Sequence, residues 1–225
     1  MNGNILQKSD NLPQNLEAVL ESGCFESLQH LDLSYGVLDD VHCWKGFISG
    51  LESGKVPNLT SLRLSENSGV DLADLLPFLL LHPLENLIMD GCGINSLEVE
   101  DLTEAILDWA SSPLTLKRLD LHNNELDDRA VPAFVSLVDS GKLGQLQELD
   151  LSKNSGMDSR ALVTLMETIQ RSHHPNLKLL IWARSRLHDA AAAEAFLRLY
   201  DEYEVVTDEW YQVLCRFREA RFVSG

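Results

Sequence analysis

The chain has 225 residues, of which 44% are hydrophobic and 24% charged, as is typical of a soluble globular protein. Its formal net charge of −17 argues against a nucleic-acid-binding protein, because such proteins present a basic surface to phosphates. No apolar run approaches the roughly 18 residues that a membrane-spanning helix needs, and the longest one, near 75–81, is interrupted by Pro77.

The first eight residues show no basic region followed by an apolar stretch, so we expect no secretory signal. The four cysteines are scattered, and none forms a C-x-x-C pair. We interpret them as reduced core thiols of an intracellular protein, rather than as disulfides or metal ligands. We expect the protein in the cytoplasm, with the nucleus as the alternative. The cysteines are Cys24, Cys43, Cys92 and Cys215.

One pattern recurs six times and is clearest in residues 116–126, which read L-x-x-L-x-L-x-x-N-x-L. Leu119 and Leu121 alternate there with Arg118, Asp120 and His122, which predicts a strand with leucines on one face and polar side chains on the other. The steps between copies are 31, 25, 32, 30 and 31 residues, which leaves room for a full helix after each strand. The copies begin at Leu28, Leu59, Leu84, Leu116, Leu146 and Leu177.

Apolar residues at helical spacing follow several of the strands, for example Ala130, Phe134 and Leu137. Shared Ser-Gly exits at Gly23, Gly54 and Gly141 predict left-handed helix caps. Gly69 and Gly156 occupy matching one-residue expansions, which we interpret as structural. Aspartates that suit helix N-caps precede the apolar stripes: Asp39 and Asp40 before 41–51, Asp127 or Asp128 before 130–138, Asp158 before 161–169, and Asp189 before the run to Tyr200.

The two ends of the chain depart from the repeat pattern. The first helix exit implies that residues 13–22 form the helix of an incomplete earlier repeat, so residues 1–27 are interpreted as an N-terminal tail and capping helix. Residues 28–203 are the six repeats. Residues 204–225 are expected to form a C-terminal capping helix beginning near Thr207, because an array of repeats needs its exposed end covered. A helix that docks onto a partner is the alternative.

Residues 28–203 resemble the ribonuclease-inhibitor-like branch of the leucine-rich repeat proteins, in which a strand, an asparagine turn and a helix recur. The resemblance implies an α/β fold: a curved right-handed solenoid with a parallel sheet on the concave side, helices on the convex side and a helical C-terminal cap. Gly36, Cys92 and Ser185 stand where that family has asparagine. Relatives include the ribonuclease inhibitor and the Ran GTPase-activating protein, so the resemblance specifies the fold better than the function.

Signals for catalysis and for metal or cofactor binding are weak. The Gly-Lys pairs at 54–55 and 141–142 lack the other residues of a phosphate-binding loop and are better interpreted as helix exits. His173 and His174 have no further metal ligand at suitable spacing. We therefore expect no enzyme activity, no metal and no cofactor.

The polar face of the strands is the candidate binding surface. We count seven acids and six bases on it, a net charge of about −1, so most of the acidity must lie on helices and loops. The bases gather toward the C-terminal half, and Leu179 and Ile181 present apolar groups there unless residues 205–210 cover them. Trp44, Trp109 and Trp182 fall on inward positions and are expected in the core. The candidate partner-binding residues are Tyr35, Arg63, Ile88, Arg118, Asp120, His122, Asp150, Lys153, Ile181 and Arg184.

These observations favour a non-enzymatic module that binds a partner protein through its concave face. One alternative is a regulator of a small GTPase, by analogy with the Ran GTPase-activating protein. Another is an intracellular effector or inhibitor that covers the active site of an enzyme. We expect a monomer that binds neither nucleic acid nor membranes.

Overall fold

The structure is a computed structural model, and it describes residues 18, 20, 22–23, 25–109, 112–172, 176–177, 179–181 and 204–206. Several predictions concern residues outside this set. They include the tail 1–12, most of the helix 13–22, Cys24, the pair His173 and His174, Trp182, Arg184, Ser185, Asp189, and the segment 207–225 with Cys215.

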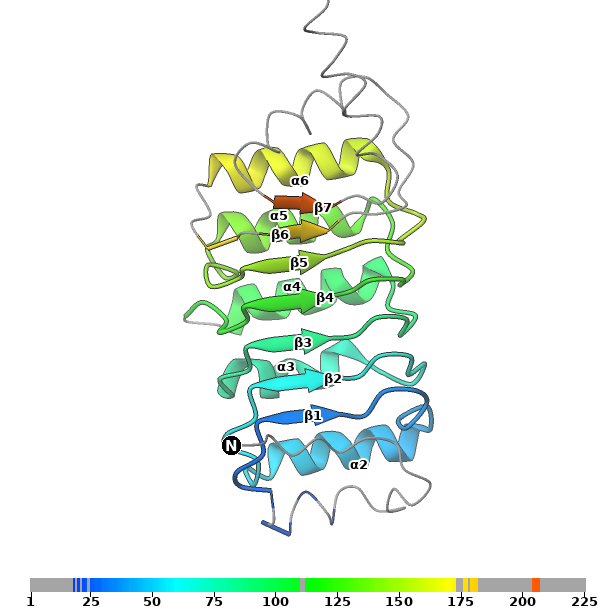
Figure 1. The fold of residues 1–225 in the computed structure, drawn as a ribbon. Coiled ribbons are helices and arrows are strands. Elements are labelled where there is room, and N and C mark those ends of the chain that lie inside the picture. The colour runs from blue at the N-terminus through cyan, green and yellow to red at the C-terminus, as the bar shows by residue number, and fades with distance from the viewer. Residues whose placement is uncertain are drawn as a thin grey trace, which may run out of the picture.

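Seven short strands form one parallel sheet whose strand order follows the sequence (Figure 1). Each strand pairs with the next in the same register, so the middle residues align, as Leu31 does with Leu62 and Leu62 with Leu87. The predicted α/β class with a parallel sheet is confirmed. The strands are β1 (His30–Asp32), β2 (Ser61–Arg63), β3 (Asn86–Ile88), β4 (Arg118–Asp120), β5 (Glu148–Asp150), β6 (Leu179–Ile181) and β7 (Glu204–Val206).

In the described part of the chain, five helices lie together on one side of the sheet, behind the strands in Figure 1, and each contacts the next. The leucines in the middle of the strands point toward them, and Leu31, Leu62 and Leu149 are buried. Removing such a side chain from water stabilises the fold by roughly 1.5–3 kcal/mol. The core therefore lies between the sheet and the helices α2 (Val41–Glu52), α3 (Leu72–Leu81), α4 (Ser96–Trp109), α5 (Ala130–Asp139) and α6 (Ser159–Arg171).

Two of the predicted aspartate caps form and one does not. Asp40 accepts hydrogen bonds from the amides of His42 and Cys43, and Asp158 accepts one from Ala161. Helix α5 differs, because its N-cap residue is Arg129 and no side chain caps it.

The two aspartates expected at α5 have other partners. Asp127 accepts a hydrogen bond from the amide of Arg129. Asp128 reaches the next repeat and accepts from the amide of Asp158 at 2.7 Å. Asp39 bonds the amide of Ser68 in the same way, 29 residues further along the chain. One aspartate of each pair therefore bonds the next repeat, Asp39 in the first pair and Asp128 in the second, and of the four only Asp40 caps a helix.

The glycine predictions are confirmed. Gly23, Gly54 and Gly141 have φ values of 73°, 70° and 73°, the left-handed conformation expected at helix exits. A Cβ atom on Gly69 would lie 2.6 Å from the carbonyl oxygen of Leu38, and one on Gly156 would lie 2.9 Å from that of Leu126. The two expansions thus need glycine because neighbouring turns approach each other closely.

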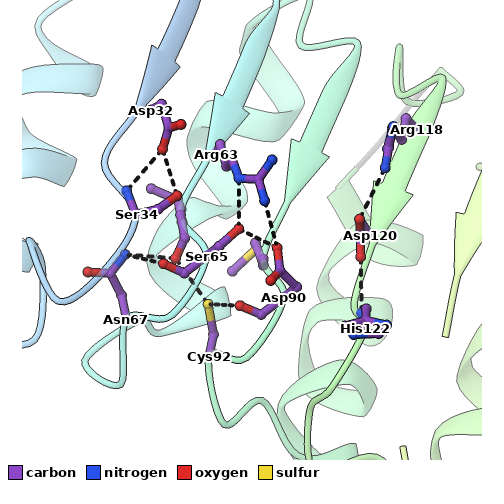
Figure 2. A network of polar contacts seen from close by, with 12 residues as sticks. Asp32, Ser34, Arg63, Ser65, Asn67, Asp90, Cys92, Arg118, Asp120 and His122 are labelled. Atoms are coloured by element: carbon purple, nitrogen blue, oxygen red, sulfur yellow. Dashed lines mark hydrogen bonds and ion pairs between the residues drawn. The ribbon is translucent and has the colours of Figure 1, made fainter. Parts of the chain in front are cut away.

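Buried asparagines connect the turns of successive repeats. The Oδ1 atom of Asn154 accepts from the amides of Asn124 and Leu126, and its Nδ2 group donates to the carbonyl of Leu121, 33 residues earlier. Asn67 bonds the preceding repeat in the same manner. Cys92 takes this place in the third repeat, where its Sγ atom donates to the carbonyl of Leu64 at 3.1 Å (Figure 2).

Two predictions about burial require correction. Trp44 is buried as expected, but Trp109, the last residue of α4, is 78% exposed. Cys92 is buried, whereas Cys43 is exposed because it lies beside the buried stripe of α2 rather than on it. Residues 204–206, the first of the segment interpreted as a C-terminal cap, form strand β7 beside β6 in the sheet, and the helix expected from Thr207 lies outside the described residues.

Candidate functional site

Because side chains alternate along a strand and the middle residues face the helices, the first and third residues lie on the other face of the sheet. Figure 1 shows this face of the sheet toward the viewer. We call this side of the sheet, with the residue that directly precedes each strand and the turn residues that directly follow it, the open face. Figure 2 shows that Asp32, Arg63 and Asp120 reach it from different strands. The open face is thus built from equivalent positions of successive repeats, so its side chains form rows across the sheet.

The aspartates that end the strands are turn-forming residues. Asp32 Oδ1 accepts hydrogen bonds from both the amide and the hydroxyl of Ser34, at 3.1 and 2.6 Å. Asp150 bonds Ser152 in the same way, at 2.9 and 2.5 Å. These bonds fix the chain as it leaves the strand, which is a common use of an aspartate two residues before a turn.

Asp120 and Asp150 are only 7% and 8% exposed. The expectation that both carboxylates are open to a partner is therefore wrong. Alternation places the side chains on the correct face, but their short length and their bonds to the turn draw them into it. The two carboxylates hold the turns in place, and the longer side chains around them are the ones exposed at the surface.

Asp120 and Asp150 are also paired in register on neighbouring strands. Burial raises the pKa of Asp120 above its usual value, and the like charge of Asp150 raises it further. The amide of His122 and the guanidinium of Arg118 oppose this by stabilising the charged form. Asp120 is thus a carboxyl group whose ionised form is destabilised by its surroundings.

A hydrogen-bonded chain links the ends of β4 and β5. The Nδ1 atom of His122 lies 2.6 Å from the hydroxyl of Ser152, which bonds Asp150. The serine hydroxyl donates its hydrogen to the carboxylate, so it must accept from the histidine. We therefore place a hydrogen on Nδ1 of His122. The serine lies between the histidine and the aspartate. In a catalytic triad the histidine occupies that middle place, so this arrangement does not activate the serine.

Three basic side chains of the open face are already paired with acids. Arg63 lies 3.4 Å from Asp90, and Lys117 lies 2.5 Å from Glu85. Arg118 bridges Asp120 and Glu148, at 3.2 and 3.3 Å. The side chains of Arg63, Lys117 and Arg118 nevertheless keep 42%, 43% and 38% exposure. The expected basic C-terminal half is therefore neutralised at Lys117 and Arg118, and their orientation is fixed.

The other candidate residues lie as follows. Tyr35 is 63% exposed in the turn after β1, while Ile88, His122 and Lys153 are half-buried. Ile181 is the last residue of β6. Arg184 lies outside the described residues.

Sequence reasoning did not single out the serines of the open face. Ser65 donates a hydrogen bond to Asp90 of the next repeat and accepts one from Arg63 Nε at 3.1 Å (Figure 2). Ser152 joins His122 to Asp150. The recurring Asp-Leu-Ser sequence at 32–34 and 150–152 was a usable signal, because an aspartate two residues before a serine favours such turns.

Other kinds of site have little support in the described part of the chain. It contains no group of three His, Cys, Asp or Glu side chains that could hold a metal ion. None of its helices is long and apolar enough to cross a bilayer. A cavity of about 40 Å³ lies between the sheet and α3–α5. It is far smaller than the 300–1,000 Å³ typical of ligand pockets.

Comparisons with known proteins do not extend this description. No family model matches the chain, and no curated protein matches it. Among solved structures, the chain is similar to a mandelate racemase/muconate lactonizing enzyme from Roseiflexus sp., with a TM-score of 0.32 and 9% identity. The match covers 85% of this chain and 49% of that enzyme, so the chain spans about half its length. These values support neither a shared fold nor a shared activity.

Proposed function

We propose that the chain is a leucine-rich repeat protein of the ribonuclease-inhibitor-like branch and binds a partner protein through the open face. Six copies of the sequence pattern support the family, together with a sheet whose strands follow one another in register. Such repeat arrays present extended binding surfaces. In this proposal the sheet is the concave side of a solenoid.

The row of half-exposed cations carries the proposal. Arg63, Lys117 and Arg118 are held by acids of their own or the neighbouring repeat, so a partner would meet side chains whose rotamers are already restricted. Preorganisation of this kind lowers the entropic cost of binding. Alternating charges favour a complementary partner and repel others. Tyr35 adds an exposed aromatic ring at the N-terminal end, and aromatic and arginine side chains dominate the energetics of protein interfaces.

A matched pair of charge-reversal variants tests the open face. The first, Arg63→Glu with Lys117→Glu, changes it. The second, Lys45→Glu with Lys55→Glu, makes the same change of net charge at two exposed residues away from it. Proteins crosslinked to each variant in a lysate are compared quantitatively with those crosslinked to the wild type.

We expect a defined set of partners to be lost from the first variant and kept by the second. Both variants should melt within a few degrees of the wild type, because Lys45 and Lys55 are exposed and the ion pairs lost at Arg63 and Lys117 are open enough to solvent to contribute little. Equal losses from both variants would show that net charge alone drives binding. Retention of every partner by the open-face variant would refute the proposal.

A further inference from the structure

The outward surface of α3 is unusually apolar. Its exposed residues are Ala73, Pro77 and Leu81, which are spaced four apart and so form one stripe. Leu81 is 82% exposed. The single charge of the helix, Asp74, accepts a hydrogen bond from Trp44 Nε1 at 2.8 Å. A helix that packs on a core normally turns charged residues outward, so this stripe is not explained by the fold.

The C-terminal end of the next helix, α4, adds a large apolar side chain. Trp109, the last residue of α4, is 78% exposed. Helices α3 and α4 contact each other, and the segments that follow them also adjoin, since Thr115 Oγ1 donates to the carbonyl of Leu84 at 2.8 Å. We define the outer patch as Pro77, Leu81 and Trp109. It lies on the helical side of the molecule, away from the open face (Figure 1).

The surroundings of the outer patch are strongly acidic. Helix α4 contains five acids, helix α3 contains Asp74, and neither helix contains a lysine or an arginine. Glu104 and Asp108 are exposed on the last turns of α4, which end at Trp109. An apolar patch with a rim of one sign of charge is a candidate binding site, and it selects an occupant of the opposite sign.

We propose that the outer patch binds a basic amphipathic segment of a partner protein. Trp109 and Leu81 would bury against its apolar face, while Glu104 and Asp108 would pair with its lysines or arginines. Amphipathic helices bind apolar surfaces in this way in many complexes. A second copy of this chain is disfavoured, because its net charge of −17 would bring acid against acid. An anionic membrane surface would be repelled for the same reason.

A synthetic peptide of defined chemistry tests the proposal without knowledge of the partner. The first peptide has 18 residues, with leucines at helical spacing and lysines elsewhere. A second replaces every lysine with glutamate, and a third scrambles the first so that its leucines form no stripe. Binding of each labelled peptide to the full chain is followed by fluorescence anisotropy.

Two double variants distinguish binding at the outer patch from nonspecific binding to other exposed apolar side chains. Leu81→Ser with Trp109→Ser removes its anchors. Val41→Ser with Leu97→Ser removes two exposed apolar side chains from the first turns of α2 and α4. We expect the lysine peptide to bind the wild type, and its Kd to rise about tenfold or more for the first variant, as loss of an interface hot spot requires. The second variant should keep the wild-type Kd within about twofold.

The acidic rim gives a second, independent readout. Glu104→Lys with Asp108→Lys should weaken the lysine peptide, whereas Glu167→Lys, an exposed change on α6, should have little effect. Several outcomes would overturn the proposal: no binding of the lysine peptide, equal affinity for the glutamate or scrambled peptide, or unchanged affinity of the Leu81/Trp109 variant. Sedimentation that shows a dimer dissociated by Trp109→Ser would identify a second copy as the occupant instead. None of these results depends on the open face.

Discussion

One residue position determines the turn that ends each strand. Tyr35, Glu66, Gly91, Asn123 and Lys153 are equivalent in the repeat, and all adopt positive φ, between 55° and 68°. Glycine and asparagine adopt this conformation easily, but for other residues it costs about 1 kcal/mol or more. Tyrosine, glutamate and lysine therefore occupy the turn despite the backbone strain. Their side chains are placed at the edge of the open face, as a binding role would require.

Asp120 offers a test of electrostatics at a single residue. Its pKa is raised in the folded protein, so the protonated carboxyl group favours the folded state more than the ionised one does. This contribution to the free energy of unfolding is present at low pH and is lost as the pH rises through the folded pKa. Asp120→Asn removes the charge and keeps an oxygen that can accept from the amide of His122. We expect the variant to melt a few degrees above the wild type at pH 7 and to show no such gain at pH 3.

A control separates charge from hydrogen bonding at this position. Asp120→Ala removes the acceptor as well as the charge, and it should melt below the asparagine variant at both pH values because the amide of His122 loses its partner. The quantity to compare is the melting temperature of Asp120→Asn minus that of the wild type. If this difference is smaller at pH 7 than at pH 3, the account is contradicted.

The two described cysteines should differ sharply in reactivity. Burial raises the pKa of Cys92 to about 11, and its Sγ atom donates to the carbonyl of Leu64. Because the thiolate is the reactive form, Cys92 should not react with a disulfide reagent at pH 7.5 until the protein is unfolded. Exposed Cys43 should react quickly. Cys43→Ser should remove one fast-reacting thiol from the native protein, whereas a loss caused by Cys92→Ser would show that the third repeat opens.

At the scale of the repeat element, the asparagine turn can be compared with its cysteine replacement. Asn124 bonds the amides of Cys92 and Ile94 and the carbonyl of Met89, all buried. Asn124→Ala leaves these groups unpaired, and we expect it to lower the free energy of unfolding by about 3 kcal/mol. Cys92→Ala removes one weak donor and should cost about 1 kcal/mol. Denaturant unfolding measures both, and equal losses would show that the asparagine bonds add little.

The core beneath β3 and β4 is incompletely packed, because a cavity lies there between the sheet and the helices. The cavity measures about 40 Å³ and is lined almost wholly by apolar side chains, among them Leu87, Ile106 and Phe134. Thr103 also lines it, and the hydroxyl of Thr103 is buried without a hydrogen-bond partner in the described part of the chain.

Replacement of this hydroxyl should stabilise the protein. Thr103→Val has nearly the same shape, and we expect it to raise the free energy of unfolding by about 1–2 kcal/mol, because an unpaired buried hydroxyl is costly. Thr103→Ser keeps the hydroxyl and enlarges the cavity, so it should lower stability. Thermal unfolding of both variants tests this, and a loss of stability in Thr103→Val would show that a bound water satisfies the hydroxyl.

For the whole molecule, the sequence was most informative where structure repeats. Alternating leucines predicted the strands and the face that each strand turns toward the core. This succeeded because every repeat has to bury the same leucine positions, so the pattern recurs along the sequence. The burial of Asp120 and the exposure of Trp109 were not predictable in this way. The first depends on hydrogen bonds to the following turn, and the second on where neighbouring helices end. Residues 204–206 read Glu-Val-Val and pair as a strand without the leucine pattern.

The arrangement of contacts has a consequence for unfolding. In the described part, each strand pairs with the next strand and each helix contacts the next helix. Stability in such an array is approximately the sum of the repeats and of the interfaces between neighbours. Damage at one end should therefore loosen that end without unfolding the other, whereas a single compact core would lose protection throughout.

Native-state hydrogen exchange can distinguish these behaviours. Leu31→Ala removes a buried side chain from β1 and should cost about 3–5 kcal/mol locally. We expect faster amide exchange in α2 and β1, with wild-type rates in α5. Leu149→Ala, the equivalent change in β5, should give the reverse distribution, with fast exchange around α5 and α6 and an unchanged α2. Faster exchange across all helices in either variant would show that the chain unfolds as one cooperative unit, and the additive description would then fail.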